Sequence, residues 1–196
     1  AAGCWAGHVS RSAGIENVPI VPRKRRVYVF HCPEAVVREE PGVPMVFDPS
    51  GVWFRREGTC QVGHFVCGRA VGPDPDLEGT AEDLEAGSGD GFFEEKCWEH
   101  LAHRVPAFEN IKVVNSWQGF YDYNKLDQNA IIGRHPEVED FIFAAGFSGH
   151  GIQHTPAVGR AVAELVVEGK FQSIDLSRFG FERVLNGEPF LEAVCY

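Results

Sequence analysis

Long apolar runs, paired cysteine motifs and an excess of basic charge are all missing from this 196-residue sequence. No stretch approaches the ~20 consecutive apolar residues that a helix needs to span a bilayer, so no transmembrane segment is predicted. Six cysteines stand at irregular spacings without a C-x-x-C or paired Cys/His pattern, which disfavours structural zinc and favours buried free thiols. The 28 acidic against 18 basic residues give a net charge of -10, which argues against nucleic acid as a partner.

The start of the sequence and one basic cluster also carry information. The chain opens AAGCWAGHV, without an initiator methionine or a signal-type basic region, so we expect a fragment or a processed chain. Its length of 196 residues predicts one large globular domain or one and a half, and its hydrophobic content of 44% is enough for a real core. The basic residues 23–26 (RKRR) run directly into a strand-like segment. This context favours a solvated or cofactor-facing strand edge over a targeting signal.

Residues 26–70 have the alternating pattern of β-strands. RVYVFHC (26–32), PMVFDPSGVWFRRE (44–57) and GHFVCGRA (63–70) predict an antiparallel meander with a DPSG turn inside its second segment. The acidic segment 72–91 is rich in glycine and proline and predicts an exposed loop or insertion.

The next segment changes to helical spacing. Phe93, Cys97, Leu101 and Val105 fall four residues apart, which predicts a helix that ends before Pro106. A strand is then predicted over 111–123 (IKVVNSWQGFYDY), followed by the polar turn NKLDQNA and a short apolar IIG.

The last third predicts a strand, a glycine loop and a helix. FIFAA (141–145) is a short apolar strand, and GFSGHG (146–151) follows it. Thr155 is a suitable N-cap, with Pro156 at the first helical position and Gly169 closing the helix. The helix would bury one apolar face, made of Ala157, Val158, Ala161, Val162, Leu165 and Val166.

The spacing of the glycine loop excludes several kinds of site. The loop does not match the nucleophile elbow G-x-S-x-G, the phosphate loop G-x-x-x-x-G-K-[ST] or the dinucleotide pattern G-x-G-x-x-G. The pairs His150/His154 and His100/His103 lack a third ligand, so no metal is predicted. Two interpretations remain: an anion or cofactor contact at the helix start, or a purely structural turn.

A family resemblance bears on this choice. AAGFSGHGIQ, followed by PAVGRAVAEL, resembles the C-terminal flavin-contacting segment of the superfamily of D-amino acid oxidase, sarcosine oxidase and dimethylglycine dehydrogenase. AAGCW at the start resembles the second FAD-contacting stretch of that superfamily. VPRKRRVYVFHCP, DPSGVWFRREG, YDYNKLDQNAIIG and GKFQSIDLSRFGFERV, in this order, resemble a mitochondrial member implicated in assembling respiratory complex I.

The resemblance implies an α/β fold. An α+β substrate domain with an antiparallel sheet would be joined to the C-terminal strand and helix of a Rossmann-like FAD-binding domain, with the N-terminal βαβ unit absent. The implied segments are a remnant of the FAD-binding domain (1–25), a substrate or cap domain (26–125), the strand, loop and helix of the FAD-binding domain (126–170) and a C-terminal tail (171–196). Without the βαβ unit, we expect these 196 residues alone not to bind FAD.

The resemblance also implies a site for non-covalent FAD. The loop would contact the pyrimidine edge of the flavin, where its amides would stabilise negative charge on the reduced ring. Trp117 and Tyr121 are candidates for a substrate pocket, with aromatic core packing as the alternative. No catalytic residue is assigned. The implied cofactor-binding residues are Ala2, Gly3, Trp5, Gly119, Gly146, Phe147, Ser148, Gly149, His150, Gly151, Ile152 and Gln153.

Three departures from the family limit what the resemblance implies. Phe120 stands where monomeric sarcosine oxidases link their flavin through a cysteine, and Gln153 stands where they carry a substrate-binding lysine. No lysine occurs near Trp53 or Arg55, where the family has an oxygen-activating lysine. A dehydrogenase or a largely non-enzymatic role is therefore favoured over an oxidase.

Two functions remain open at this stage. The first is an FAD-dependent oxidoreductase of the amine or amino-acid dehydrogenase/oxidase type that acts on a small amine. It would be located in the mitochondrion, in the matrix or at the matrix face of the inner membrane. It would serve complex I assembly or stability through contacts with complex I subunits or assembly intermediates. The second is a non-catalytic flavin-binding scaffold or assembly chaperone.

Overall fold

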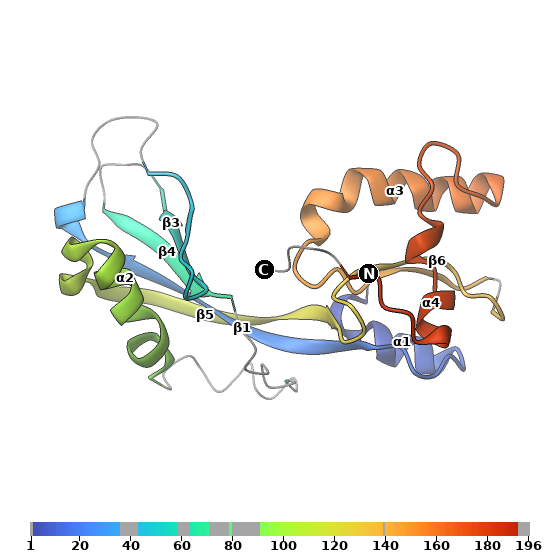
Figure 1. Cartoon of the computed structure of the whole chain (residues 1–196), viewed down its shortest axis with the longest axis horizontal. Helices are drawn as coiled ribbons and strands as arrows, with labels where there is room; N and C mark the ends of the chain where they lie inside the picture. The colour runs from blue at the N-terminus through green and yellow to red at the C-terminus, as the bar shows by residue number, and fades with distance from the viewer. Residues whose placement is uncertain are drawn as a thin grey trace. The chain divides into compact units, whose positions relative to one another are not determined.

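The structure is a computed structural model that describes residues 2–35, 43–58, 63–70, 79, 91–138 and 140–191 (Figure 1). Within these ranges no helix has both the length and the apolar character needed to cross a membrane. The elements, in chain order, are η1 (Gly3–Trp5), α1 (Ala6–Ser12), β1 (Ile20–His31), η2 (Pro33–Ala35), β2 (Val46–Phe47), β3 (Val52–Arg56), β4 (His64–Arg69), η5 (Glu94–Trp98), α2 (Glu99–Arg104), η6 (Pro106–Asn110), β5 (Lys112–Asn124), β6 (Ile131–Arg134), β7 (Ile142–Ala145), α3 (Gly151–Glu168), η7 (Ser177–Phe179) and α4 (Glu182–Asn186).

The chain forms two compact units. The terminal unit combines Ala1–Arg23 with Phe120–Cys195, and the central unit is Lys24–Gly119. Both boundaries fall inside strands, because β1 and β5 run from one unit into the other along the chain. The assignment of the predicted segments to FAD-binding and substrate domains stays a prediction.

The sheet to which the central unit contributes most has the strand order β2-β3-β4-β1-β5. β4 pairs antiparallel with both β3 and β1, the latter in the register Val27↔Gly68 to His31↔His64. The predicted turn between β2 and β3 is confirmed, since the Gly51 amide donates to the Asp48 carbonyl at 2.8 Å. The predicted meander is wrong at one point, because β1 lies beside β4 rather than β2. β2 has only two residues and lies at the edge of the sheet, where it pairs with β3.

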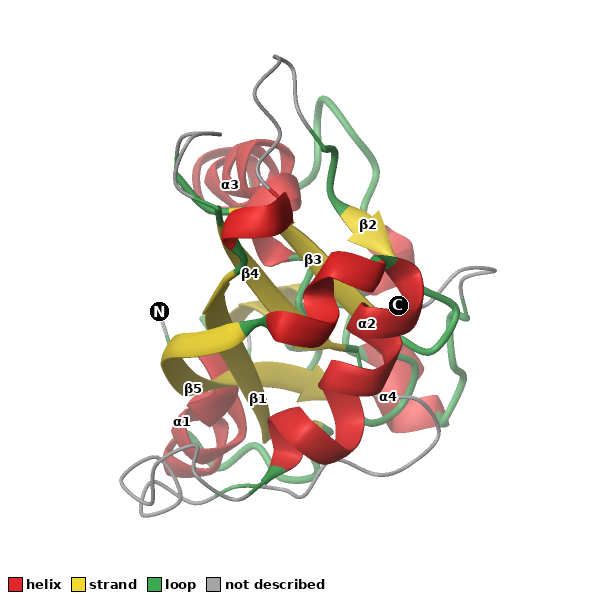
Figure 2. Ribbon diagram, turned by 90° about the vertical axis from the view of Figure 1, so that its left-hand side faces the viewer, coloured by secondary structure: helices red, strands yellow, loops and turns green. Residues whose placement is uncertain are grey.

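Aromatic rings form the core of the central unit. Figure 2 shows α2 lying across the strands of the sheet, and the buried cluster joins this helical segment to strand residues such as Phe30 and Phe65. Cys97 and Leu101 are buried as their spacing predicts, and the helix ends at Arg104, before Pro106. The first part of this segment, η5, is a π-helix. The predicted insertion at 72–91 lies almost entirely outside the described residues.

Buried free thiols are confirmed in the central unit. Cys32, Cys67 and Cys97 are all buried and unpaired by disulfides. Burial raises the pKa of Cys97 to about 11 and raises the pKa of Cys67 still further. Such thiols stay protonated at neutral pH and are poor nucleophiles.

The terminal unit contains the β6–β7 hairpin and α3. The hairpin pairs antiparallel from Ile131↔Ala145 to Arg134↔Ile142. Val158, Ala161 and Leu165 of α3 are buried, as the apolar face predicts, whereas Ala157 and Val166 are exposed, contrary to it. Gly169 ends the helix with φ 75°. A left-handed residue at this position favours glycine, so this part of the prediction is confirmed.

The predicted start of α3 is wrong by several residues. The helix begins at Gly151, and Pro156 lies inside it rather than at its first position. Thr155 is likewise not the N-cap, because its hydroxyl donates back to the Gly151 carbonyl at 2.8 Å. The helix starts early because the left-handed residues Ser148 and Gly149 have already turned the chain before His150.

Candidate functional site

The glycine loop between β7 and α3 has an unusual backbone. Gly146, Ser148 and Gly149 have φ values of 79°, 50° and 96°. Glycine is required at 146 for a second reason, since a Cβ there would come within 3.0 Å of the Ile20 side chain. Left-handed serine is uncommon, but here the Ser148 hydroxyl accepts a hydrogen bond from the Asn124 amide at 3.0 Å.

Asp122, near the end of β5, binds the first part of this loop. Its Oδ2 accepts hydrogen bonds from the amides of Gly146 at 2.7 Å and Phe147 at 3.1 Å. Its carbonyl accepts a third from the Ser148 amide at 3.1 Å. These three loop amides therefore already have acceptors within the chain.

The start of α3 leaves its own amides open. An α-helix has no internal acceptor for its first amides, which here belong to Gly151, Ile152 and Gln153. His150 at the N-cap provides no side-chain cap. These amides carry the positive end of the helix dipole, and the Ile152 side chain beside them is 85% exposed. The helix start therefore combines a positive partial charge with one exposed apolar side chain, a combination that would favour a ligand acquiring negative charge.

The N-terminal stretch lies close to Asp122. Gly3 has φ 53°, and a Cβ on it would meet no atom within 4 Å. The Trp5 ring packs edge-on against Phe120 at a centroid distance of 6.1 Å. Partial burial raises the pKa of Cys4, and the negative charge of Asp122 raises it further. The structure therefore brings together two of the predicted stretches, 2–5 and 146–148, at Asp122.

The remaining candidates lie along β5. Tyr121, in the terminal unit, is half-buried and packs edge-on against Tyr123 at 6.1 Å. Trp117 and Gly119 belong to the central unit, where Trp117 is 47% exposed. The grouping of these three residues into one pocket stays a prediction.

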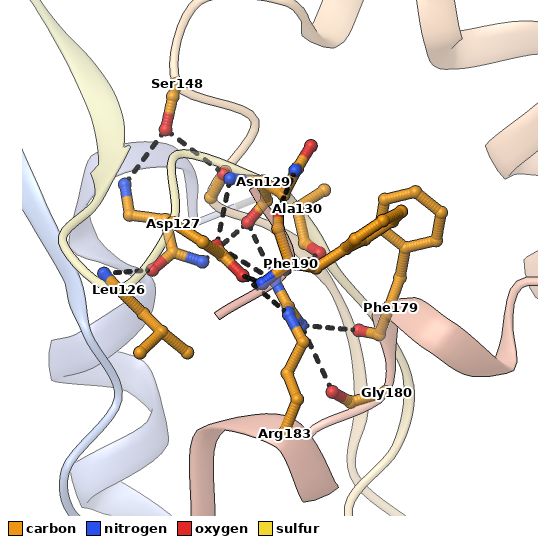
Figure 3. Close-up of polar contacts among 11 residues, drawn as sticks. Leu126, Asp127, Asn129, Ala130, Ser148, Phe179, Gly180, Arg183 and Phe190 are labelled. Atoms are coloured by element: carbon orange, nitrogen blue, oxygen red, sulfur yellow. Dashed lines mark hydrogen bonds and ion pairs between the residues drawn. The ribbon is translucent and has the colours of Figure 1, made fainter. Parts of the chain in front are cut away.

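Below the loop lies a buried polar network that the sequence did not reveal (Figure 3). Arg183 of α4 donates to Asp127 from Nε at 2.8 Å and from Nη2 at 3.2 Å. Its other hydrogen bonds reach backbone carbonyls, including those of Asn129 and Ala130 at 3.0 Å each. Asn124 connects this network to the loop, because its side chain donates to the Asn129 carbonyl at 2.5 Å.

A local signal for this network exists in the turn 124–130. Asn124 accepts from the Leu126 amide and Asp127 from the Asn129 amide, both at 3.0 Å. Short polar side chains make such local bonds readily, so two ordered turns could have been predicted here. The burial of these turns by Arg183 could not have been predicted, because Arg183 lies 56 positions after Asp127 in the sequence.

Metal binding finds no support in the described ranges, where no cluster of three His, Cys, Asp or Glu side chains could hold an ion.

Comparison with known proteins identifies the family. The model of the family described as FAD dependent oxidoreductase matches residues 1–165. The chain belongs to this family. It is 47% identical to the Xenopus laevis protein named FAD-dependent oxidoreductase domain-containing protein 1, over 98% of this chain and 39% of that protein. The Bos taurus protein of the same name is also 47% identical, over 98% of this chain and 40% of its length. The chain thus spans about two-fifths of these relatives.

Two solved structures share the fold of this chain over part of their own length. L-proline dehydrogenase from P. horikoshii superposes with a TM-score of 0.73 at 29% identity, covering 97% of this chain and 47% of that one. Glycine oxidase from Geobacillus kaustophilus gives 0.69 at 25% identity, covering 91% and 43%. The predicted mixed α/β fold with an antiparallel sheet is confirmed.

The start of α3 has room for a ligand such as the FAD of this family, and the predicted contact residues stay a prediction. Gly149 leaves open space where a Cβ would stand, so a ligand can approach the backbone there. The amides of Gly146 and Phe147, by contrast, are used by Asp122. The amides best suited to a flavin are therefore those at the first turn of α3.

Proposed function

We propose that the protein of which this chain forms part is a flavoprotein that holds FAD non-covalently and oxidises a small amine or amino acid. The observation that carries the proposal is the open first turn of α3, in a chain whose family is FAD-dependent. When bound, FAD would take up the electrons released by the substrate. The amides of Gly151, Ile152 and Gln153 would stabilise the negative charge that accumulates on the flavin.

The substrate class is supported by the names of similar proteins. They include L-proline dehydrogenase, glycine oxidase and monomeric sarcosine oxidase. Gln153 is neutral and exposed, so it would not pair with a substrate carboxylate as a cation would. Phe120 has no thiol to form a covalent flavin bond. A secondary amine fits these residues best, and any carboxylate that it carries would be bound at a position other than Gln153.

The cellular role extends the proposal. We place the protein in the mitochondrial matrix or at the matrix face of the inner membrane, where it would assist the assembly or stability of complex I. Complex I subunits or assembly intermediates would be its partners. Support comes from the resemblance of phrases such as YDYNKLDQNAIIG to a mitochondrial member of the family.

Anaerobic reduction of the purified full-length protein tests the catalytic function. We expect a yellow protein with one FAD, whose flavin absorbance is bleached by proline, sarcosine or a related secondary amine. A protein that binds no FAD would refute the proposal. Complex I activity in cells lacking the protein, with and without re-expression, tests the cellular role separately.

A scaffold without turnover is the second candidate, and two positions in the central unit argue against the oxidase form of the first. Trp53 lies over Gly68, where a Cβ would clash with its ring at 2.7 Å, and Arg55 pairs with Glu57 at 2.7 Å. Neither position therefore presents a lysine for oxygen activation. If the protein retains FAD that no amine reduces, and still restores complex I, the scaffold is correct.

A further inference from the structure

Asp122 occupies a position that neither the sequence patterns nor the family assignment singles out. One carboxylate oxygen, Oδ2, accepts from both Gly146 and Phe147, while the Asp122 carbonyl accepts from Ser148. A single residue of β5 thus fixes three successive amides of a loop that lies 24 positions later. Removing the carboxylate would leave the amides of Gly146 and Phe147 without their acceptor, while the backbone hydrogen bond to Ser148 would remain.

In the described part of the chain, no cation lies within ion-pair distance of Asp122. The ion pairs at Arg55, Arg104, Arg160 and Arg183 are all formed with other carboxylates. The negative charge nevertheless acts on its surroundings, because it helps to raise the pKa of Cys4 after the larger effect of burial. Asp122 therefore places a negative charge between the 2–5 stretch and the glycine loop.

We propose that Asp122 is a positioning residue that fixes the glycine loop and lowers the reduction potential of the bound flavin. This inference rests on the proposed FAD function. A fixed negative charge opposes the addition of electrons to a nearby group, and the opposition is stronger in a partly buried site than in water. The two amides offset only part of the carboxylate charge. The positive end of the α3 helix dipole would raise the reduction potential of the flavin. The potential would therefore depend on the balance between this dipole and the Asp122 charge.

Two substitutions in the full-length, FAD-loaded protein separate the two roles. Asp122→Asn keeps an oxygen acceptor but removes the charge, so we expect a more positive midpoint potential and an FAD dissociation constant within about threefold of wild type. Asp122→Ala removes the acceptor, and we expect FAD to bind about tenfold more weakly. In the apoprotein, Asp122→Ala should also speed hydrogen exchange at the amides of Gly146 and Phe147.

Asp140→Asn is the matched control. Asp140 is exposed in the turn between β6 and β7, at the opposite end of β7 from the glycine loop, so the same loss of charge should leave the potential unchanged.

An Asp122→Asn potential equal to wild type would overturn the electrostatic role. Unchanged FAD affinity and exchange in Asp122→Ala would overturn the positioning role. A wild-type protein that binds no FAD would refute the proposed function itself. Should the alanine variant not fold, the asparagine variant still decides the potential.

Discussion

Both units of this chain have buried apolar cores, but the terminal unit also buries a charged network beside its apolar clusters. In the central unit the Phe108 ring lies edge-on to Phe30, Phe54 and Phe65, with centroid distances between 5.0 and 5.3 Å. In the terminal unit the guanidinium of Arg183 is buried against Asp127 and a set of backbone carbonyls. Aromatic packing fills space and tolerates related shapes, whereas a buried ion pair holds one geometry and tolerates little change. The rigid geometry lies beside the loop that we assign to the flavin.

The largest expected effect comes from breaking the terminal network. Arg183→Met leaves the Asp127 carboxylate buried without its cation, and we expect the free energy of unfolding to fall by about 3–5 kcal/mol. Urea denaturation of the full-length protein measures the loss, and hydrogen exchange should locate it around residues 124–130. Arg160→Met is the control, because its pair with Glu164 is exposed at the arginine and should cost less than about 0.5 kcal/mol. Equal effects of the two substitutions would contradict the contrast between the units.

A smaller effect is expected from a shape change in the aromatic core. Phe108→Leu keeps the site apolar but removes edge-on ring contacts, which we expect to cost about 2 kcal/mol of unfolding free energy. The comparison variant is Arg183→Lys, which keeps the charge but cannot reproduce the forked pair to Asp127. The same denaturation experiment compares them. If Phe108→Leu costs more than Arg183→Lys, the central core is the less tolerant of the two.

This contrast also explains what could be predicted from the sequence. The apolar spacing of Cys97 and Leu101 and the glycine at 169 predicted a helical face and a helix end correctly, because burial and backbone conformation are local demands. The partner of β1 could not be predicted, since strand pairing depends on contacts distant in sequence.

The candidate site shows the same division. The glycine loop could be recognised from GFSGHG, but its acceptor Asp122 could not, because a polar residue in a strand gives no sign of what it binds. The turn NKLDQNA has the composition of an exposed loop, although Asp127 is only 3% exposed. Its burial depends on Arg183, near the other end of the chain.

The smallest effect concerns a charged pair at the surface of the central unit. Hydrogen bonding from the Ser50 amide, together with Arg104, lowers the pKa of Asp48 to about 2. Because the folded pKa is depressed, this stabilisation is complete above about pH 4 and is lost as the pH falls through 2. Arg104 is exposed, so we expect Asp48→Asn to cost less than about 1 kcal/mol at pH 7, and the cost should shrink as the pH falls through 2. Denaturation of both proteins across this pH range measures the difference. A loss at pH 7 as large as that of Arg183→Met would show that this surface contact stabilises the central unit as much as the buried network stabilises the terminal unit. That result would contradict the contrast drawn between the two units.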